Sequence, residues 1–417
     1  MTVSLPPRLS GADWLRRSET QAVFAAVAAH GFAARAVGGA VRNTLLGLPV
    51  TDVDIATPAR PDDVIAAAEA AGLKAIPTGI THGTVTIVSG SRRYEVTTLR
   101  KDVETHGRHA TVVFTDDWAA DAGRRDFTLN ALYCSADGEV SDPLSGYADL
   151  AARRVRFIGE AAERIREDYL RVLRFFRFNA EYGNGPPDTE GLAACVRERE
   201  GLAILSGERV CQEVLRLLAA PRGPELVRWM LDYGLLPQVL GLAPRPTLLS
   251  RLAGLEAALG LTPDPVLRLA ALGVEVPEDA ERLRDRLRLS NEDTVKLTRA
   301  SMRTPAINPA VPESAAKAEL YAGSEAVYRE RVLIAWARSN EEPASPAWRC
   351  RLSLPERWQA PRFPIGGADV MALGVPAGPH VGELLRALEA WWIAGDFTAD
   401  EAALRARLGA SVGTTQK

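Results

Sequence analysis

The first 150 residues mix helical and extended hydrophobic patterns. Residues 20–30 are rich in alanine and place apolar positions at helical spacing, which predicts an amphipathic helix. Short runs rich in β-branched residues follow, and a Ser89-Gly90-Ser91 turn signal separates two of them. The predicted strands are residues 36–37, 53–55, 84–88 and 93–98. This part of the chain is therefore predicted to be a small domain of both helices and strands.

After about residue 153 the extended patterns disappear, and apolar residues recur at helical spacing. The clearest helical segments are residues 161–180, 208–219 and 224–231. Clusters of proline and glycine at 183–187, 221–224, 243–246 and 361–367 divide them into groups. We therefore expect an α+β protein with domains at residues 1–150, 151–240 and 241–417, the last two all-α.

The composition is typical of a soluble globular protein. Of 417 residues, 47% are hydrophobic and 25% are charged, and the length suggests several domains. No apolar run approaches the roughly 18 residues of a membrane span, and no signal peptide is evident, so a cytoplasmic protein without a membrane partner is expected. The four cysteines lack paired spacing, which predicts buried free thiols. A net charge of -3 does not indicate a nucleic-acid partner, although it can conceal a local basic surface.

The first candidate for chemistry is a pair of aspartates behind a glycine-rich segment. Asp52 and Asp54 alternate in an extended run, so both carboxylates are expected on one face of a strand. Such a pair can bind Mg²⁺ together with substrate phosphates. Just before it, Gly38 and Gly39 let the backbone approach a triphosphate, and Arg42 can neutralise an oxygen. An isolated Asp-X-Asp is more often a turn or a solvated edge, but this proximity favours a metal site.

A third carboxylate, Glu95, lies in the predicted strand 93–98, with Tyr94 and Val96 suited to the opposite face. It can complete the metal site or take the proton from an attacking hydroxyl. The alternative is an ordinary exposed glutamate on a strand.

Arginines mark two further segments. In residues 124–130, Arg125, Asp126 and Asn130 are of types suited to phosphate and ribose, although a structural Arg-Asp pair at a helix start is the plain alternative. Residues 166–178 predict a helix whose polar groups recur every third residue and so share one slowly rotating face. Those groups are Asp168, Arg171, Arg174 and Arg177.

Together these segments resemble the motifs of the class II tRNA nucleotidyltransferase and bacterial poly(A) polymerase family. The family carries Gly-Gly-X-Val-Arg-Asp, Asp-X-Asp, Arg-Arg-Asp-Phe-Thr and Glu-Asp-X-X-Arg in this order, and all four are found here within residues 36–177. Residues 142–150 resemble the family's connecting motif. The chain departs from the pattern at Asn43, where aspartate is usual, and at Ser145, where glycine is common.

The resemblance implies a polymerase-β-like nucleotidyltransferase head with a mixed sheet at residues 1–150. A helical neck at 151–240 and a helical body and tail at 241–417 would follow and bind the tRNA acceptor arm. The implied reaction adds C, C and A to the tRNA 3′ end from CTP and ATP and releases pyrophosphate. The polar stretch 99–110 resembles a flexible loop of members that add the terminal A. A poly(A) polymerase or a non-catalytic RNA-binding protein are the alternatives, and no pattern predicts an oligomeric state.

For the site, the resemblance implies Mg²⁺ on Asp52 and Asp54, with Glu95 as the third catalytic carboxylate. Cytosine and adenine both present an amino donor beside a ring-nitrogen acceptor, whereas uracil and guanine present the reverse. Asp168 would accept from the amino group while Arg171 donates to the ring nitrogen, so wrong bases would leave polar groups unpaired. The implied nucleotide-binding residues are Gly38, Gly39, Arg42, Arg125, Asp126, Asn130, Asp168, Arg171, Arg174 and Arg177.

Overall fold

A computed structural model describes residues 6–106 and 109–415 of the chain. Its internal contacts divide the chain into two compact units. The first comprises Met1–Pro244 and Asp285–Leu289, and the second comprises Arg245–Arg284 and Ser290–Lys417. The division into three domains stays a prediction.

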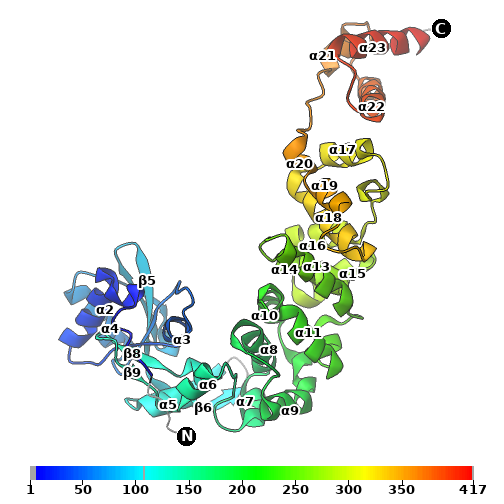
Figure 1. The fold of residues 1–417 in the computed structure, drawn as a ribbon. Coiled ribbons are helices and arrows are strands. Elements are labelled where there is room, and N and C mark those ends of the chain that lie inside the picture. The colour runs from blue at the N-terminus through cyan, green and yellow to red at the C-terminus, as the bar shows by residue number, and fades with distance from the viewer. Residues whose placement is uncertain (1–5, 107–108, 416–417) are drawn as a thin grey trace. The chain divides into compact units, whose positions relative to one another are not determined.

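A seven-stranded mixed sheet forms the N-terminal part of the first unit (Figure 1). Its strand order is β3-β4-β5-β2-β1-β8-β9, in which β2 and β5 pair in parallel and the other neighbours are antiparallel. The strands are β1 (Arg35–Val37), β2 (Asp54–Thr57), β3 (Lys74–Gly79), β4 (Thr84–Ser89), β5 (Arg92–Thr98), β8 (Tyr133–Ser135) and β9 (Val140–Ser141). The α+β fold and the mixed sheet are confirmed.

Six helices accompany the sheet, and α2 and α4 pack together against β4 and β5. The predicted amphipathic helix at residues 20–30 is α2, which buries Val23, Phe24 and Val27. The helices are α1 (Asp13–Arg16), α2 (Ser18–Ala29), α3 (Gly39–Leu45), α4 (Pro61–Ala70), α5 (Trp118–Gly123) and α6 (Gly146–Ala151), with short 3-10 turns η1 (Ile80–His82) and η2 (Thr128–Asn130). The first residues of β2 and α3, Asp54 and Gly39, line a cavity that is described below.

The stretch 99–110 was expected to be a loop, but most of it forms a hairpin. Strands β6 (Arg100–His106) and β7 (His109–Phe114) pair with Arg100 opposite Phe114. Residues 107–108 lie outside the described residues. The polar sequence of this stretch lacks the alternation of apolar and polar residues by which a strand is recognised, so its two strands were not predicted.

The remainder of the first unit is helical, as predicted. The segment 161–180 was expected to be one helix, but it breaks at Asp168, whose extended backbone (φ −154°) separates α7 from α8. The break arises because Asp168 Oδ1 accepts from the Leu170 N–H, 3.1 Å away, and so turns the chain into α8. The elements are α7 (Ala161–Glu167), α8 (Leu170–Tyr182), α9 (Thr189–Arg197), η3 (Arg199–Ile204), α10 (Gly207–Ala219), α11 (Gly223–Asp232) and α12 (Leu236–Leu240).

The second unit is also helical, and its C-terminal helices share an apolar cluster around Trp392, Leu404 and Leu408. Its elements are α13 (Pro246–Ala258), α14 (Pro265–Gly273), α15 (Pro277–Leu287, whose last residues group with the first unit), α16 (Asn291–Ser301), η4 (Pro305–Ile307), α17 (Glu313–Ala322), α18 (Glu325–Ser339), α19 (Pro346–Leu352), α20 (Leu354–Arg357), α21 (Gly367–Met371), α22 (Pro379–Ala394) and α23 (Glu401–Thr415). Among the described residues, no helix is both long and apolar enough to span a membrane.

The expectation of buried thiols is correct for only part of the set. Cys134 and Cys195 are buried, whereas Cys211 is half-buried and Cys350 is exposed. Cys350 lies on the exposed side of α19, because its position along the helix places it away from the buried face. The wide spacing of the four cysteines in the sequence gave no information on this.

The junction between sheet and helices is held by a compact turn. Asp142 accepts from the Gly146 and Tyr147 N–H groups at 2.7 and 3.0 Å. A Cβ on Gly146 would lie 2.1 Å from the Thr128 carbonyl oxygen, so no larger residue fits there. Ser145, the position where the family commonly has glycine, is left-handed at φ 56° and ψ 34°. The turn keeps its conformation with serine and bears the strain of a side chain in that region.

Replacing Ser145 by glycine is expected to stabilise the first unit by up to about 1 kcal/mol, because the relief of left-handed strain slightly exceeds the backbone entropy that glycine loses on folding. Urea unfolding followed by fluorescence measures the change. Ser145→Ala is the matched control, since it removes the hydroxyl and keeps the strain, and it should give no gain. Equal stabilisation by both variants would contradict the strain argument.

Candidate active site

Three acidic residues, Asp52, Asp54 and Glu95, lie in or just before two neighbouring strands of the sheet. Asp54 is the first residue of β2 and stands in parallel register with Glu95 on β5. Val53 and Ile55 are buried while Asp52 and Asp54 are exposed, so both aspartates point to the same side of the chain. The strand predicted at 53–55 begins in the structure at Asp54, so Asp52 precedes β2. There the Thr51 hydroxyl donates to Asp52 Oδ2 over 2.9 Å.

The electrostatics of this region suit a cation. Burial raises the pKa of Asp54 above its usual value. The negative charges of Glu95 and Asp52 raise it as well, whereas the positive charge of Arg125 lowers it. Within the described residues, no group of three or more His, Cys, Asp or Glu side chains converges on one metal position. Two carboxylates open to solvent nevertheless fit Mg²⁺, which normally takes one or two carboxylates and completes its shell with substrate phosphates and water.

The glycine-rich turn leads into α3. Gly38 has φ 69° and ψ −117°, a conformation unfavourable for any residue with a side chain. A Cβ on Gly38 would lie 3.7 Å from Arg125 Nη1 and from the Asn130 carbonyl oxygen. The Gly38 N–H donates to the Leu132 carbonyl oxygen at 3.2 Å, so what the missing side chains at Gly38 and Gly39 provide is open space beside Arg125.

Arg42 on α3 is nearly buried and fixed on several sides. It donates through Nη1 to Asn130 Oδ1, through Nη2 to the Tyr182 hydroxyl at 2.8 Å, and to Asn43 Oδ1 at 2.9 Å. Its guanidinium also stacks 4.1 Å from the Tyr182 ring centroid, and burial lowers its pKa. Asn43 therefore supplies an acceptor as expected, and its Nδ2 donates to the Pro49 carbonyl at 2.9 Å, a bond that aspartate lacks the donor to make.

A buried aspartate that the sequence did not single out holds both arginines of the Arg-Arg-Asp motif. Asp121 accepts from Arg124 Nε at 2.8 Å, from Arg125 Nη2 at 3.1 Å and from the Tyr133 hydroxyl at 2.7 Å. Burial opposes its ionisation, but the charges of Arg124 and Arg125 outweigh burial and lower its pKa. The sequence offered one indication of this pairing. Asp121, on α5, precedes Arg124 and Arg125 by three and four residues, the spacing at which side chains of a helix contact each other.

Asp126 acts on neighbouring side chains rather than standing free for a ligand. Its Oδ2 accepts from Arg174 Nε at 2.9 Å, and its Oδ1 accepts from Asn130 Nδ2 at 2.9 Å. Arg177 points to a different partner, Glu213, at 2.5 Å. Arg177 is buried in that pairing and is not among the residues that line the cavity described below. Its predicted contact with a nucleotide stays a prediction.

The predicted base-reading pair lies at the break between α7 and α8. Asp168 Oδ2 accepts from Arg209 Nη2 at 2.5 Å. Arg171 pairs with Glu167 and donates to the Arg164 carbonyl at 2.8 Å. The prediction that Asp168 and Arg171 share a helix face is wrong because Asp168 precedes α8. Each is held by its own charged partner, which fixes its direction.

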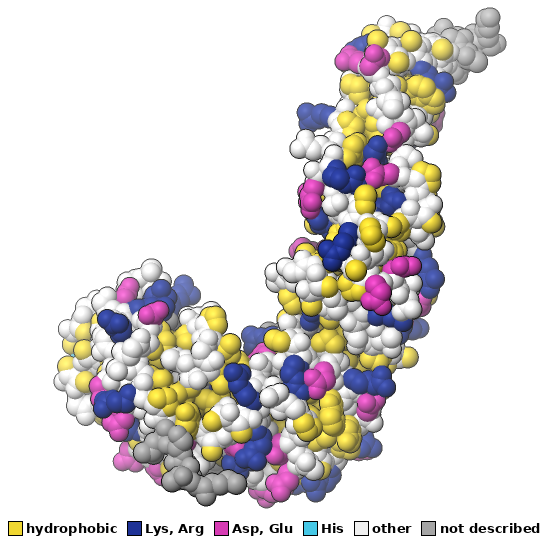
Figure 2. Space-filling model, viewed as in Figure 1, with side chains coloured by type: hydrophobic (Ala, Val, Ile, Leu, Met, Phe, Trp, Pro, Cys, Tyr) yellow, Lys and Arg dark blue, Asp and Glu magenta, His cyan; other side chains and the backbone are white. Residues whose placement is uncertain are grey.

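These groups surround one cavity of 350 Å³ in the first unit. Five of its residues are arginines and three are aspartates, so its lining has a local excess of positive charge. On the face shown in Figure 2, basic and acidic side chains are otherwise interspersed. The lining residues are Gly38, Gly39, Arg42, Asp54, Arg124, Arg125, Asp126, Asn130, Asp168, Arg171, Arg174 and Phe178. Asp52 and Glu95 lie outside this lining but adjoin it through Asp54.

A mixed sheet that carries paired carboxylates beside a glycine turn, facing an arginine-rich cavity, defines a nucleotidyltransferase. Comparison with known proteins supports this class. The Poly A polymerase head domain family matches residues 34–156, and the family described as the probable RNA and SrmB-binding site of polymerase A matches residues 187–245.

Similar proteins of known name cover most of the chain. The mitochondrial CCA tRNA nucleotidyltransferase 1 of Mus musculus is 37% identical over 86% of this chain and 82% of its own length. The CCA-adding enzyme of Geobacillus stearothermophilus is 35% identical over 86% and 88%. The crystal structure of the Bacillus stearothermophilus CCA-adding enzyme in complex with CTP has a TM-score of 0.74 at 29% identity and covers 95% of this chain and 98% of its own. The chain belongs to the family of CCA-adding tRNA nucleotidyltransferases, whose members are generally metal-dependent.

Proposed function

We propose that this protein adds C, C and A to the 3′ end of tRNA from CTP and ATP. The observation that carries the proposal is the single cavity that joins Gly38, Gly39 and Asp54 to Asp168 and Arg171. A triphosphate site and a base-reading pair in one space fit a polymerase that chooses its nucleotide without a nucleic-acid template. The names of the similar proteins, and the CTP, ATP and tRNA in the titles of solved relatives, agree with this function.

In the proposed reaction, the tRNA 3′-hydroxyl oxygen bonds to the α-phosphorus and gives its proton to a carboxylate of the site, such as Glu95. The bond between the α-phosphorus and the α–β bridging oxygen breaks, and pyrophosphate departs. Asp52 and Asp54 would hold Mg²⁺, which supplies positive charge to the attacking and leaving oxygens. Glu95, in register with Asp54, would be the third catalytic carboxylate. Arg42 and Arg125 would bind triphosphate and ribose, while Asp126 and Asn130 keep Arg174 and Arg42 in position.

For the base, Asp168 would accept from the amino group of C or A, and Arg171 would donate to the ring nitrogen. Arg209 and Glu167 support this role by orienting the two charged groups. The helical neck at 151–240 and the body and tail at 241–417 would bind the acceptor arm, mainly through phosphates. A cytoplasmic location remains part of the proposal.

The experiment that tests the proposal supplies the protein and Mg²⁺ with tRNAs that end before C, after C and after CC, each with one nucleotide at a time. The expected products are C, C and A in that order, followed by arrest, read on a sequencing gel. A long A tract on unrelated RNA would instead assign a poly(A) polymerase, and no incorporation on any acceptor would leave an RNA-binding protein.

A further inference from the structure

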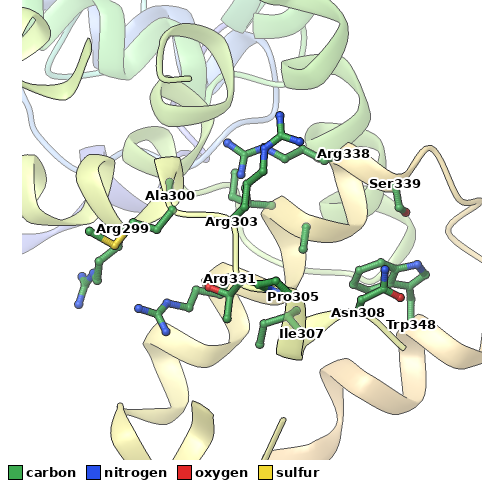
Figure 3. A pocket seen from close by; sticks show the side chains of 14 residues that line it. Arg299, Ala300, Arg303, Pro305, Ile307, Asn308, Arg331, Arg338, Ser339 and Trp348 are labelled. Atoms are coloured by element: carbon green, nitrogen blue, oxygen red, sulfur yellow. The ribbon is translucent and has the colours of Figure 1, made fainter. Parts of the chain in front are cut away.

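A second cavity, of 260 Å³, lies within the second unit between α16, η4, α18 and α19 (Figure 3). Its inner wall is apolar: Ile307, Ile334 and Trp348 line it and are nearly inaccessible to solvent. Thr304, Asn308 and Ser339 add polar groups. A concave, mainly apolar space with a few polar groups is typical of a small-molecule site.

The charged residues of this cavity are all cationic. Arg299, Arg303, Arg331 and Arg338 line it, and no acidic residue belongs to the described lining. The first three have acidic partners outside the cavity: Glu330 at 4.0 Å, Glu275 at 2.9 Å and Glu319 at 2.5 Å. Within the described part of the chain, Arg338 has no ion pair, and its buried Nε has no hydrogen-bond partner.

Arg338 stands next to other positive charges. Burial, and after it the charges of the Arg245 and Arg303 guanidinium groups, lower its pKa to about 10. Figure 3 shows Arg303 and Arg338 together at one end of the cavity. Like charges held together in a partly buried space cost free energy, which an anion placed between them would recover.

We propose that this cavity binds a small phosphorylated molecule of nucleotide size, with Arg303 and Arg338 on its phosphate and the apolar wall against its organic part. A small molecule fits better than an RNA backbone, because backbone phosphates contact outward-facing cations along a surface. Here Arg303 and Arg338 lie together at one end of a recess whose wall is apolar. The site is separate from the nucleotide-binding cavity of the first unit and shares no residue with it.

The test is calorimetric titration of the full-length protein with AMP and, separately, with inorganic phosphate. Arg338→Gln should weaken AMP binding at this site about tenfold or more, since it removes a charge-assisted hydrogen bond. Arg329→Gln is the matched control and should leave binding unchanged, because Arg329 lies on the same helix α18 but outside the cavity lining and pairs with Glu325 and Glu356. Arg171→Ala, in the other cavity, should leave this binding event in place.

Arg303→Gln gives an independent check, because this side chain is largely exposed and its loss does not threaten folding. Thermal melting by circular dichroism verifies that each variant is folded. Two results would overturn the proposal: AMP binding that is the same in wild type and Arg338→Gln, or a variant that weakens tRNA binding while AMP binding is unaffected.

Discussion

Nucleotide addition should fall by at least about a thousandfold when Asp54 is replaced by alanine, because a metal held at the reacting phosphate supplies several kcal/mol of transition-state stabilisation. Asp54 is the first residue of β2, lines the nucleotide-binding cavity and is paired in register with Glu95 on β5. No neighbouring carboxylate in that cavity can replace it, since Asp126 and Asp168 are held by Arg174 and Arg209. Single-turnover incorporation of radiolabelled CTP measures the loss.

The matched control is Asp62→Ala, which removes an exposed carboxylate from α4 in the same domain. It should keep nearly full activity, and Asp54→Ala should bind tRNA within about twofold of the wild type by filter binding. An Asp54→Ala enzyme that retains a tenth of the wild-type rate would refute the metal-binding role.

Asp54 also makes a prediction about stability. The pKa of Asp54 is higher in the folded protein than in the unfolded chain, so ionisation of Asp54 lowers the free energy of unfolding. This destabilisation is complete at pH values above both pKa values and is absent below the pKa of the unfolded chain. At pH 7 without metal, Asp54→Asn should therefore be slightly more stable than the wild type while being inactive. Added Mg²⁺ should stabilise the wild type and leave the variant unchanged.

The second large effect concerns base selection. Replacing Arg171 by alanine should lower the preference for CTP over UTP, measured as the ratio of kcat/KM values, by about 10- to 100-fold. This range corresponds to the roughly 1–3 kcal/mol that an unpaired buried polar group costs. Asp168→Ala should reduce the same ratio, since each residue reads one side of the same pair of base atoms. The ratio is the proper readout because a merely structural role would slow all nucleotides alike.

Arg171→Lys separates charge from geometry. Lysine keeps the charge but not the planar fork, so selectivity should fall only in part. Arg166→Ala is the matched control, because Arg166 lies on α7 close to the pair but faces solvent and pairs with Glu198. An unchanged CTP-to-UTP ratio in both Arg171→Ala and Asp168→Ala would remove the base-reading role from this pair.

Local patterns predicted much of this site because chain neighbours carry its motifs. Asp54 and Glu95 follow from patterns within single strands, and Asp52 lies two residues before Asp54 on the same side of an extended chain. Gly38 was predicted for a backbone that approaches a ligand, and its positive φ agrees with that expectation. The hairpin of β6 and β7 was missed because pairing partners, rather than its own residues, specify it.

The supporting groups were not predictable in this way. Arg42 contacts Tyr182, and Asp168 contacts Arg209, across 140 and 41 residues of chain. Nothing in either sequence segment identifies the other. Asp126 also receives Arg174, which lies 48 residues further along the chain, and its predicted contact with the nucleotide stays a prediction.

The sequence by itself determined the class of protein, the mixed sheet followed by helices, and most of the residues that line the cavity of the first unit. These depend on periodicity and on motifs that lie within short segments. Only the tertiary structure decided that Asp168 starts a new helix, that Arg177 pairs with Glu213, and that four arginines of the second unit share a cavity. The physical reason is that a charged side chain takes its role from the partners that folding brings to it, and those partners come from distant parts of the chain.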